Sequence, residues 1–238
     1  MSFARNLGRV AGFWYLLVIV FGTLYLVYIP NKVFVHGDAA ATVRNLVSHQ
    51  WLFRLGMVDE LLCAVLLVLL VLSLQRLFEG VDRQLAILVV ILGGVLQAAI
   101  SLVNVANDAG ALRVATDPSF LPAFEGPQRT ALVMLLLKLH DYEINASLML
   151  SGAWLFPLGM LVYRSRFLPR FLGIWLLLGG IGWLVLFLTA MLAPEYQDKV
   201  FEYAQPVFFG EIALTLWLLI KGAGPSAPDI ASSSLSTM

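Results

Sequence analysis

Six apolar stretches, each close to twenty residues long, divide the sequence and restrict its fold more than any other feature. A helix rises about 1.5 Å per residue, so about 20 apolar residues cross the roughly 30 Å hydrocarbon core of a bilayer. The composition agrees, since 60% of the 238 residues are hydrophobic and 13% are charged. We therefore predict an all-α protein, a polytopic bundle of about six transmembrane helices. The predicted spans are 9–29, 52–74, 85–107, 143–163, 169–192 and 204–221.

The segments between and after these spans have patterns of their own. Residues 36–51 offer Asp38 as a helix cap and apolar positions on one face, which predicts a short amphipathic helix at the membrane interface. Residues 109–129 contain three prolines, which predicts an irregular outer loop. Residues 1–222 are expected to form a single transmembrane domain. The small and polar tail 223–238 is expected to be disordered and cytoplasmic.

The distribution of basic residues predicts the orientation. Arg and Lys occupy short connections and span ends on the side that also carries the N-terminus: Arg5, Arg9, Arg76, Arg83, Arg164, Arg166, Arg170 and Lys221. By the positive-inside rule both termini should be cytoplasmic, in a multi-pass protein of the inner (plasma) membrane. The first apolar run is too long for a signal peptide and should be retained. No dense Lys/Arg run indicates a nucleic-acid partner, and the single cysteine, Cys63, excludes an internal disulfide.

Polar side chains recur at helical spacing inside the predicted bundle. The third span carries one stripe, and the fourth carries two neighbouring stripes. Because polar groups inside a bilayer should not face lipid, we expect the stripes to meet in a pocket in the outer half of the membrane. Their residues are Gln97, Ser101, Asn104 and Asp108 in the third span, and His140, Glu143 and Ser147 beside Lys138, Asp141 and Asn145 in the fourth.

These residue types suggest several kinds of site. Imidazole and carboxylate groups exchange protons, which makes His140, Asp59, Glu60 and Glu211 the candidate catalytic residues. The candidate ligand-binding residues are Gln97, Asn104, Asp108, Asp141, Asn145 and Arg54. A metal ion is a further hypothesis, with His140 and Glu143 as ligands and Asp59, Glu60 or Glu211 completing the shell. The alternative in each case is structural: a hydrogen-bonded network, an ion pair of Asp59 or Glu60 with Arg54 or Lys138, or a neutral Glu211 bonded to another helix.

Tyrosine and tryptophan residues, including Tyr15 and Tyr25, are interpreted as packing or interfacial residues without a ligand. The glycines of "LLLGGIGW" are interpreted as sites of close helix approach, or alternatively as a hinge.

Five segments resemble one protein family. They are "RVAGFWYLLVIVFG", "HGDAAATVRNLVSHQWLFRLGMVDELL", "LKLHDYEINASLMLSG", "YRSRFLPRFLGIWLLLGGIGW" and "PVFFGEIALTLWLLIKG". In this order, over about residues 8–222, they resemble the bacterial membrane proteins of domain-of-unknown-function family 4386. Matching positions include Arg54, Asp59, His140, Asp141 and Glu211, whereas Glu143 stands where the family has a small residue such as glycine. The resemblance implies a polytopic bacterial inner-membrane fold and no particular activity.

Three functions follow as hypotheses. The first is binding of a small or amphiphilic ligand, such as a lipid, in the outer pocket. The second is an intramembrane enzyme that acts on a lipid or isoprenoid, which requires Asp59, His140 and Glu211 to lie close together around a cavity. The third is a proton- or cation-coupled transporter that uses Glu211 and Asp59. Membrane lipids are the expected partners, and the sequence identifies no cofactor and no oligomeric state.

Overall fold

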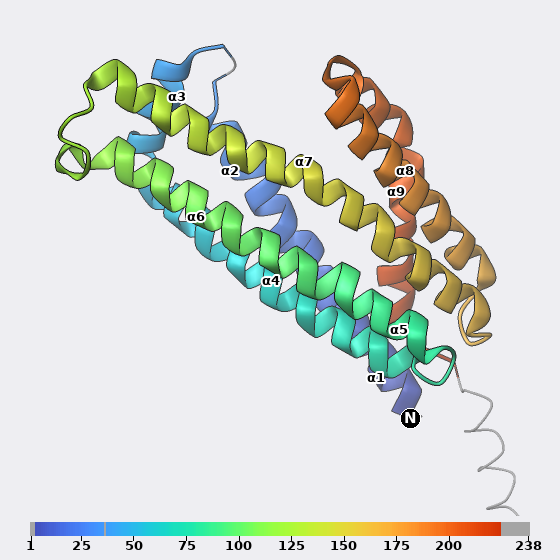
Figure 1. Cartoon of the computed structure of the whole chain (residues 1–238). Helices are drawn as coiled ribbons and strands as arrows, with labels where there is room; N and C mark the ends of the chain where they lie inside the picture. The colour runs from blue at the N-terminus through green and yellow to red at the C-terminus, as the bar shows by residue number, and fades with distance from the viewer. Residues whose placement is uncertain (1–2, 36, 225–238) are drawn as a thin grey trace, which may run out of the picture. The chain divides into compact units, whose positions relative to one another are not determined.

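The computed structural model describes residues 3–35 and 37–224, and all regular structure in these residues is helical (Figure 1). The elements are α1 (Phe3–Thr23), π-helix η1 (Leu24–Tyr28), α2 (Ile29–Val33), α3 (Ala39–Ser48), α4 (Gln50–Phe78), α5 (Arg83–Val90), π-helix η2 (Ile91–Val95), α6 (Leu96–Thr116), 3₁₀-helix η3 (Pro118–Phe120), α7 (Gly126–Arg164), α8 (Arg170–Leu192), 3₁₀-helix η4 (Pro194–Tyr196) and α9 (Gln197–Ile220). The predicted all-α class is confirmed.

Within the described residues, six helical runs are long and apolar enough to cross a membrane. They are Arg5–Val33, Gln50–Phe78, Arg83–Thr116, Gly126–Arg164, Arg170–Leu192 and Pro194–Ile220. Large apolar side chains remain exposed on these runs, for example Leu102 and Ile220 with 63% and 66% of their surface accessible. Such exposure suits a lipid environment. The chain is an integral, multi-pass membrane protein, as the sequence predicts.

The prediction of an irregular loop over residues 109–129 was wrong for most of these residues. Helix α6 continues to Thr116 and α7 begins at Gly126, so only residues 117–125 connect them. Proline removes no helical hydrogen bond in the first turn of a helix, which explains why Pro127 lies inside α7. The predicted fourth span, 143–163, covers only the later part of the 39-residue α7. A bilayer sets the minimum length of a spanning helix and does not limit how far the helix extends.

The short helix expected within 36–51 is α3. The Asp38 side chain accepts a hydrogen bond from the Ala41 backbone nitrogen at 2.8 Å, which caps the helix as predicted. Thr42 is completely buried, and its hydroxyl contacts the backbone of Val35 and Asp38. The interfacial position of this helix stays a prediction. Most of the tail expected to be disordered, residues 225–238, lies outside the described residues.

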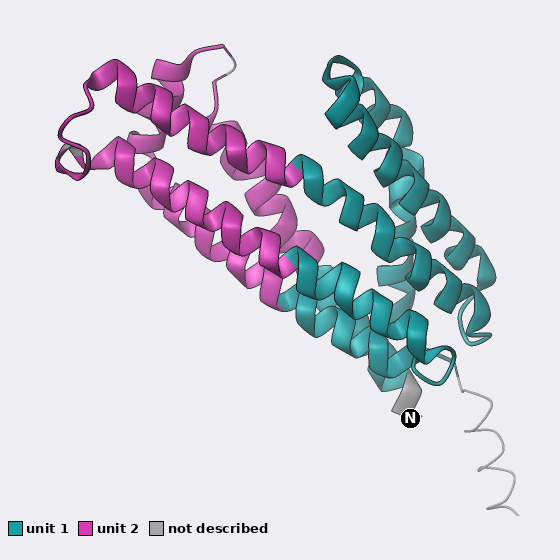
Figure 2. Cartoon of the chain, in the orientation of Figure 1, with its two compact units in different colours: residues 1–17, 66–97, 145–238 teal, residues 18–65, 98–144 magenta. Residues whose placement is uncertain are grey.

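The chain forms two compact units (Figure 2). Unit 1 comprises residues 1–17, 66–97 and 145–238, and unit 2 comprises residues 18–65 and 98–144. Four helical runs therefore contribute residues to both units.

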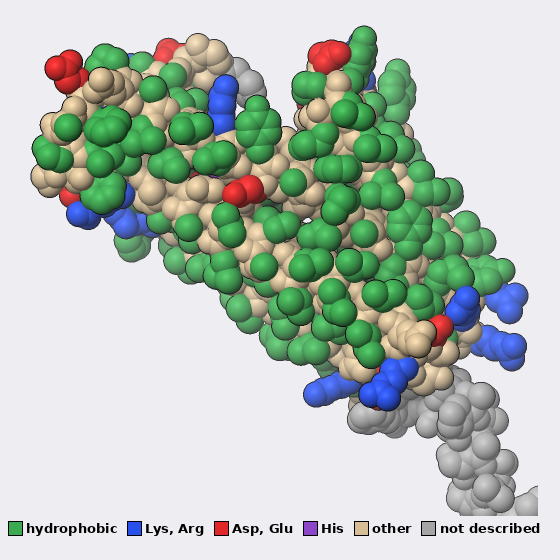
Figure 3. All heavy atoms as spheres, viewed as in Figure 1, with side chains coloured by type: hydrophobic (Ala, Val, Ile, Leu, Met, Phe, Trp, Pro, Cys, Tyr) green, Lys and Arg blue, Asp and Glu red, His purple; other side chains and the backbone are tan. Residues whose placement is uncertain are grey.

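In unit 1, α8 packs against α9, and glycines bring α7 close to α8. A Cβ atom added to Gly173 would lie 2.7 Å from the Gly159 carbonyl oxygen, and one added to Gly180 would lie 3.0 Å from the Gly152 carbonyl oxygen. At least one glycine of "LLLGGIGW", Gly180, therefore allows α8 to approach α7 closely. On the face drawn in Figure 3, Lys and Arg side chains gather at the end of unit 1 around the α4–α5 turn and the α7–α8 connection.

In unit 2, an apolar core joins α2, α3, α4, α6 and α7. Its buried members are Ile29, Val33, Leu46, Phe53, Ala111, Leu112, Val114, Val133 and Leu137. The functional candidates of this unit lie beside that core.

Candidate metal centre

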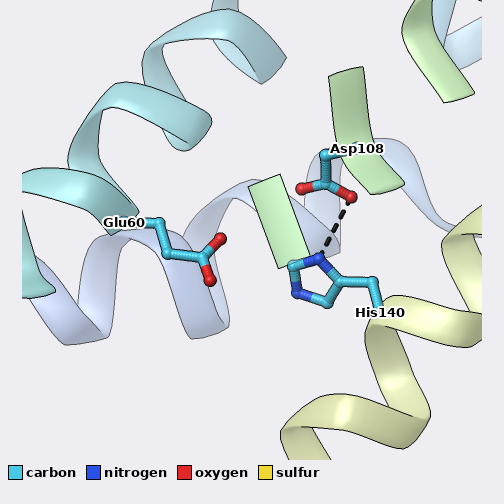
Figure 4. Close-up of side chains that lie close together, drawn as sticks. All are labelled: Glu60, Asp108 and His140. Carbon is cyan, nitrogen blue, oxygen red and sulfur yellow. Dashed lines mark ion pairs between the residues drawn. The ribbon is translucent and has the colours of Figure 1, made fainter. Parts of the chain in front are cut away.

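Three ionisable side chains from three helices meet in unit 2 (Figure 4). They are Glu60 of α4, Asp108 of α6 and His140 of α7. Each offers one ligand atom, and these atoms lie within 4.8 Å of one another. Among the residues that the structure describes, this is the one group of three or more His, Cys, Asp or Glu side chains with such spacing.

Helical periodicity places each of the three side chains toward the interior of unit 2. On α6, Asp108 lies four residues after buried Asn104 and three before buried Ala111. On α7, His140 lies seven residues after buried Val133 and three after buried Leu137. On α4, Glu60 lies four residues after Gly56, whose Cβ position would be 2.9 Å from the Cδ1 atom of Ile29. Each polar residue therefore occupies a position that would hold a core residue in an apolar helix.

The burial of these groups is costly without compensation. Glu60 is 2% exposed and Asp108 is 7% exposed. The Oε1 atom of Glu60 is buried without a hydrogen-bond partner in the described part of the chain, and its carboxylate points toward His140 (Figure 4). A buried carboxylate loses its hydration and needs a donor or a cation in return.

His140 and Asp108 interact directly. Their Nδ1 and Oδ1 atoms are 3.1 Å apart, close enough for an ion pair when the ring is protonated. The ring nitrogen is not aligned for a hydrogen bond to the carboxylate. The His140 ring and the Asp108 carboxylate therefore both retain capacity for further hydrogen bonds or metal coordination.

A cavity of about 30 Å³ adjoins the three side chains. A water molecule needs about 10–15 Å³ by the same measure, so the cavity has room for an ion and a small ligand and none for an acyl chain. Its lining contains no Lys or Arg that could offset the carboxylates; the residues are Tyr25, Ile29, Pro30, Val33, Phe34, Phe53, Gly56, Glu60, Asp108 and His140.

Other candidates of unit 2 lie outside this cavity lining. Asp59 is buried beside Tyr25 and Cys63, and its Oδ2 atom has no partner among the described residues. Arg54 and Asp141 are exposed. Asn104 is buried, and its side chain lies within interaction range of Glu60.

Glu143, the second metal ligand proposed from the sequence, has a different environment. Its Oε2 atom accepts a hydrogen bond from the Asn107 side chain at 3.0 Å. It is not part of the group formed by Glu60, Asp108 and His140.

The remaining candidates belong to unit 1 and form hydrogen bonds there. Glu211 accepts from the Tyr15 hydroxyl at 2.5 Å and from the Trp183 indole nitrogen at 3.1 Å. The Gln97 amide donates to Ser151 at 3.3 Å, and Asn145 accepts from Gln197 at 2.8 Å. The close approach of Glu211 to Asp59 and His140 that the enzyme hypothesis requires stays a prediction.

The sequence interpretation missed two features of this site. It named Asp108 as a ligand-binding residue and did not include it among the candidate metal ligands, and it interpreted Tyr25 as a packing or interfacial residue. The stripe ending at Asp108 was a usable signal, but its partners on α4 and α7 are 48 and 32 positions away in the sequence. Nothing in the sequence indicated that Tyr25 reaches the cavity.

Comparisons with known proteins identify a family without an assigned reaction. A family model described as "Domain of unknown function (DUF4386)" matches residues 10–222. An "Uncharacterized protein" of Archaeoglobus fulgidus is 32% identical over 92 residues, which cover 37% of this chain and 54% of that protein. The chain thus spans about half the length of this curated relative. No solved structure matches the chain.

Proposed function

The chain belongs to the DUF4386 family, and from the geometry of unit 2 we propose that it binds a divalent transition-metal ion at Glu60, Asp108 and His140. The observation that carries this proposal is the buried Oε1 atom of Glu60, which has no hydrogen-bond partner among the described residues and belongs to a carboxylate that points toward the other two ligand groups. A divalent cation supplies positive charge beside two carboxylates and gives the partnerless atoms of Glu60 and His140 a common partner.

The donor set restricts the choice of metal. One imidazole nitrogen and two carboxylate oxygens suit Zn²⁺, Fe²⁺ or Mn²⁺. Bonds of about 2.0–2.2 Å in tetrahedral geometry place ligand atoms about 3.3–3.6 Å apart. In the structure the three ligand atoms lie within 4.8 Å of one another, so metal binding requires the side chains to move closer together.

The size of the cavity favours an ion over the amphiphilic ligand that the sequence suggested. A space of about 30 Å³ accommodates a cation with a small ligand, whereas a lipid tail needs many times that volume. The proposed function is therefore that of a membrane-embedded metal site rather than a lipid pocket.

The direct test is metal analysis of the full-length protein in lipid nanodiscs after exposure to Zn²⁺, Fe²⁺ and Mn²⁺. We expect about one equivalent of one of these ions, and at least a ten-fold loss of affinity in Glu60→Gln, Asp108→Asn and His140→Ala, because each removes a ligand. Glu143→Gln is the matched control, since Glu143 lies on α7 one turn from His140 and bonds to Asn107. It should bind the metal as the unchanged protein does.

Two further measurements keep the test independent of folding defects. X-ray absorption of the bound metal should show nitrogen and oxygen ligands without sulfur. The unfolding temperature should rise on metal addition, because a ligand at 100 times its Kd adds about 2.7 kcal/mol to stability. A folded wild-type protein without metal, or equal metal content in all variants, would refute the proposal.

A further inference from the structure

Three protein ligands leave a four-coordinate metal with one open position. Closed structural zinc sites have four protein ligands, whereas sites that take an exogenous ligand have three. The described residues offer three ligand groups at this centre, and a cavity of about 30 Å³ adjoins them. The arrangement is that of an open site.

One further polar side chain enters this cavity from the first helical run. Tyr25 lines it together with Glu60, Asp108 and His140, and its phenol group lies within electrostatic range of Cys63, Glu60 and Asp59. The other cavity walls from this run, such as Ile29 and Val33, are apolar. A hydroxyl at the apolar side of a metal cavity is suited to bond the ligand of the metal.

Tyr25 lies in a segment of unusual helix geometry. Residues Leu24–Tyr28 form the π-helical turn η1 between α1 and α2. A π turn shifts the register of the side chains that follow it, and such turns are frequent at functional sites. Tyr28, at the other end of the same turn, is 51% exposed and does not line the cavity.

The charges of the metal ion and its ligands suggest a role for the Tyr25 hydroxyl. Two carboxylates and a divalent cation sum to zero, so a bound anion adds one uncompensated negative charge. A phenol O–H can donate a hydrogen bond to that anion, and hydrogen bonds to charged acceptors are stronger than neutral ones.

We propose that the metal ion keeps one coordination position open to the cavity for a small anionic or oxygen-donor ligand. The Tyr25 hydroxyl donates a hydrogen bond to this ligand. This inference rests on the proposed function. The ligand has no more than a few heavy atoms. Tyr25 is thus a positioning residue of the site and does not bind the metal.

The experiment uses the full chain in nanodiscs, loaded with Co²⁺ as a coloured substitute and titrated with azide. We expect azide to shift the visible absorption of the wild-type Co²⁺ protein. Tyr25→Phe should keep the Co²⁺ stoichiometry and bind azide at least about ten-fold more weakly, because one hydrogen bond to a charged group is lost. Tyr28→Phe is the matched control from the same π turn and should bind azide as the wild type does.

The outcomes separate the two proposals. Absence of Co²⁺ binding refutes the metal site and the open position with it. Bound Co²⁺ whose spectrum does not respond to azide leaves the metal site standing and overturns the open position. An azide response of equal affinity in Tyr25→Phe overturns the role of the tyrosine hydroxyl.

Discussion

Glu211 and Glu60 are both buried or partly buried carboxylates on membrane-spanning helices, and their partners differ. Both oxygens of Glu211 accept hydrogen bonds, one from Tyr15 and one from Trp183. Glu60 has a buried oxygen without a partner in the described residues. A carboxylate in a bilayer costs at least ~2.5 kcal/mol unless it is compensated. The contacts of Glu211 provide that compensation within unit 1, whereas the described residues leave one buried oxygen of Glu60 without it.

This difference predicts that Glu211 stabilises the fold without serving the metal site. Glu211→Ala leaves two hydrogen-bond donors unpaired, the Tyr15 hydroxyl and the Trp183 indole nitrogen. Each should lower the free energy of unfolding by about 1–3 kcal/mol. Glu211→Gln should be milder, because the tyrosine hydroxyl can reverse and accept a bond from the new amide. Thermal unfolding in nanodiscs measures both.

The exposed acid Glu202, also on α9, supplies the control variant Glu202→Ala, which should unfold like the wild type. Metal content should be unchanged in all three variants. If Glu211→Gln were as unstable as Glu211→Ala, the negative charge itself would be required, and a purely hydrogen-bonding role would be wrong.

At the scale of helices, small residues decide how closely α7 and α8 approach. The Cβ position of Gly173 lies 2.7 Å from the Gly159 carbonyl oxygen and 2.7 Å from the Tyr163 backbone nitrogen. Backbone atoms of a packed helix cannot rotate away as a side chain can. The pair Gly159 and Gly173 therefore holds these two helices together through contact of their backbones.

Alanine at this contact should separate the helices. Gly173→Ala is expected to cost about 1–3 kcal/mol, typical of overpacking. Gly80→Ala is the matched control, because among the described residues, its two chain neighbours aside, no atom lies within 4 Å of its Cβ position. Unfolding by denaturant in mixed micelles compares them, and equal stability of the two variants would show that the α7–α8 contact can adjust at no cost.

At the scale of the whole molecule, the arrangement of basic residues supports a proposal for orientation. Lys and Arg gather at the end of unit 1 near the α4–α5 turn and the α7–α8 connection (Figure 3). By the positive-inside rule we propose that this end is cytoplasmic and that both termini lie inside. The inner membrane as the location stays a prediction.

Cysteine labelling in intact cells tests this orientation. Cys63 is buried and can be replaced by alanine, which leaves a background for single cysteines. A membrane-impermeant maleimide should label Ser119→Cys, in the α6–α7 connection, in intact cells. It should label Glu79→Cys, in the α4–α5 turn, only after the cells are opened. The reverse pattern would establish the opposite orientation.

Much of the candidate site could be named from the sequence, but its assembly could not. Glu60 and His140 were among the predicted catalytic residues, and Asp108 was among the predicted ligand-binding residues. Glu143 and Glu211 were candidates by the same reasoning and have other partners, Asn107 for the first and Tyr15 with Trp183 for the second. The sequence indicates the type of each residue and its depth in the membrane. It does not indicate which side chains of the neighbouring helices each residue contacts.

The sequence by itself determined the class of protein, the six spanning runs and the cap of α3. These features are local, because a helix in a bilayer satisfies its backbone hydrogen bonds within its own segment and needs only sufficient apolar length. Only the tertiary structure decided that Glu60, Asp108 and His140 meet, and that Tyr25 enters their cavity from a π turn. The rotation of each helix about its axis depends on the side chains of its neighbours, and those neighbours are distant in the sequence.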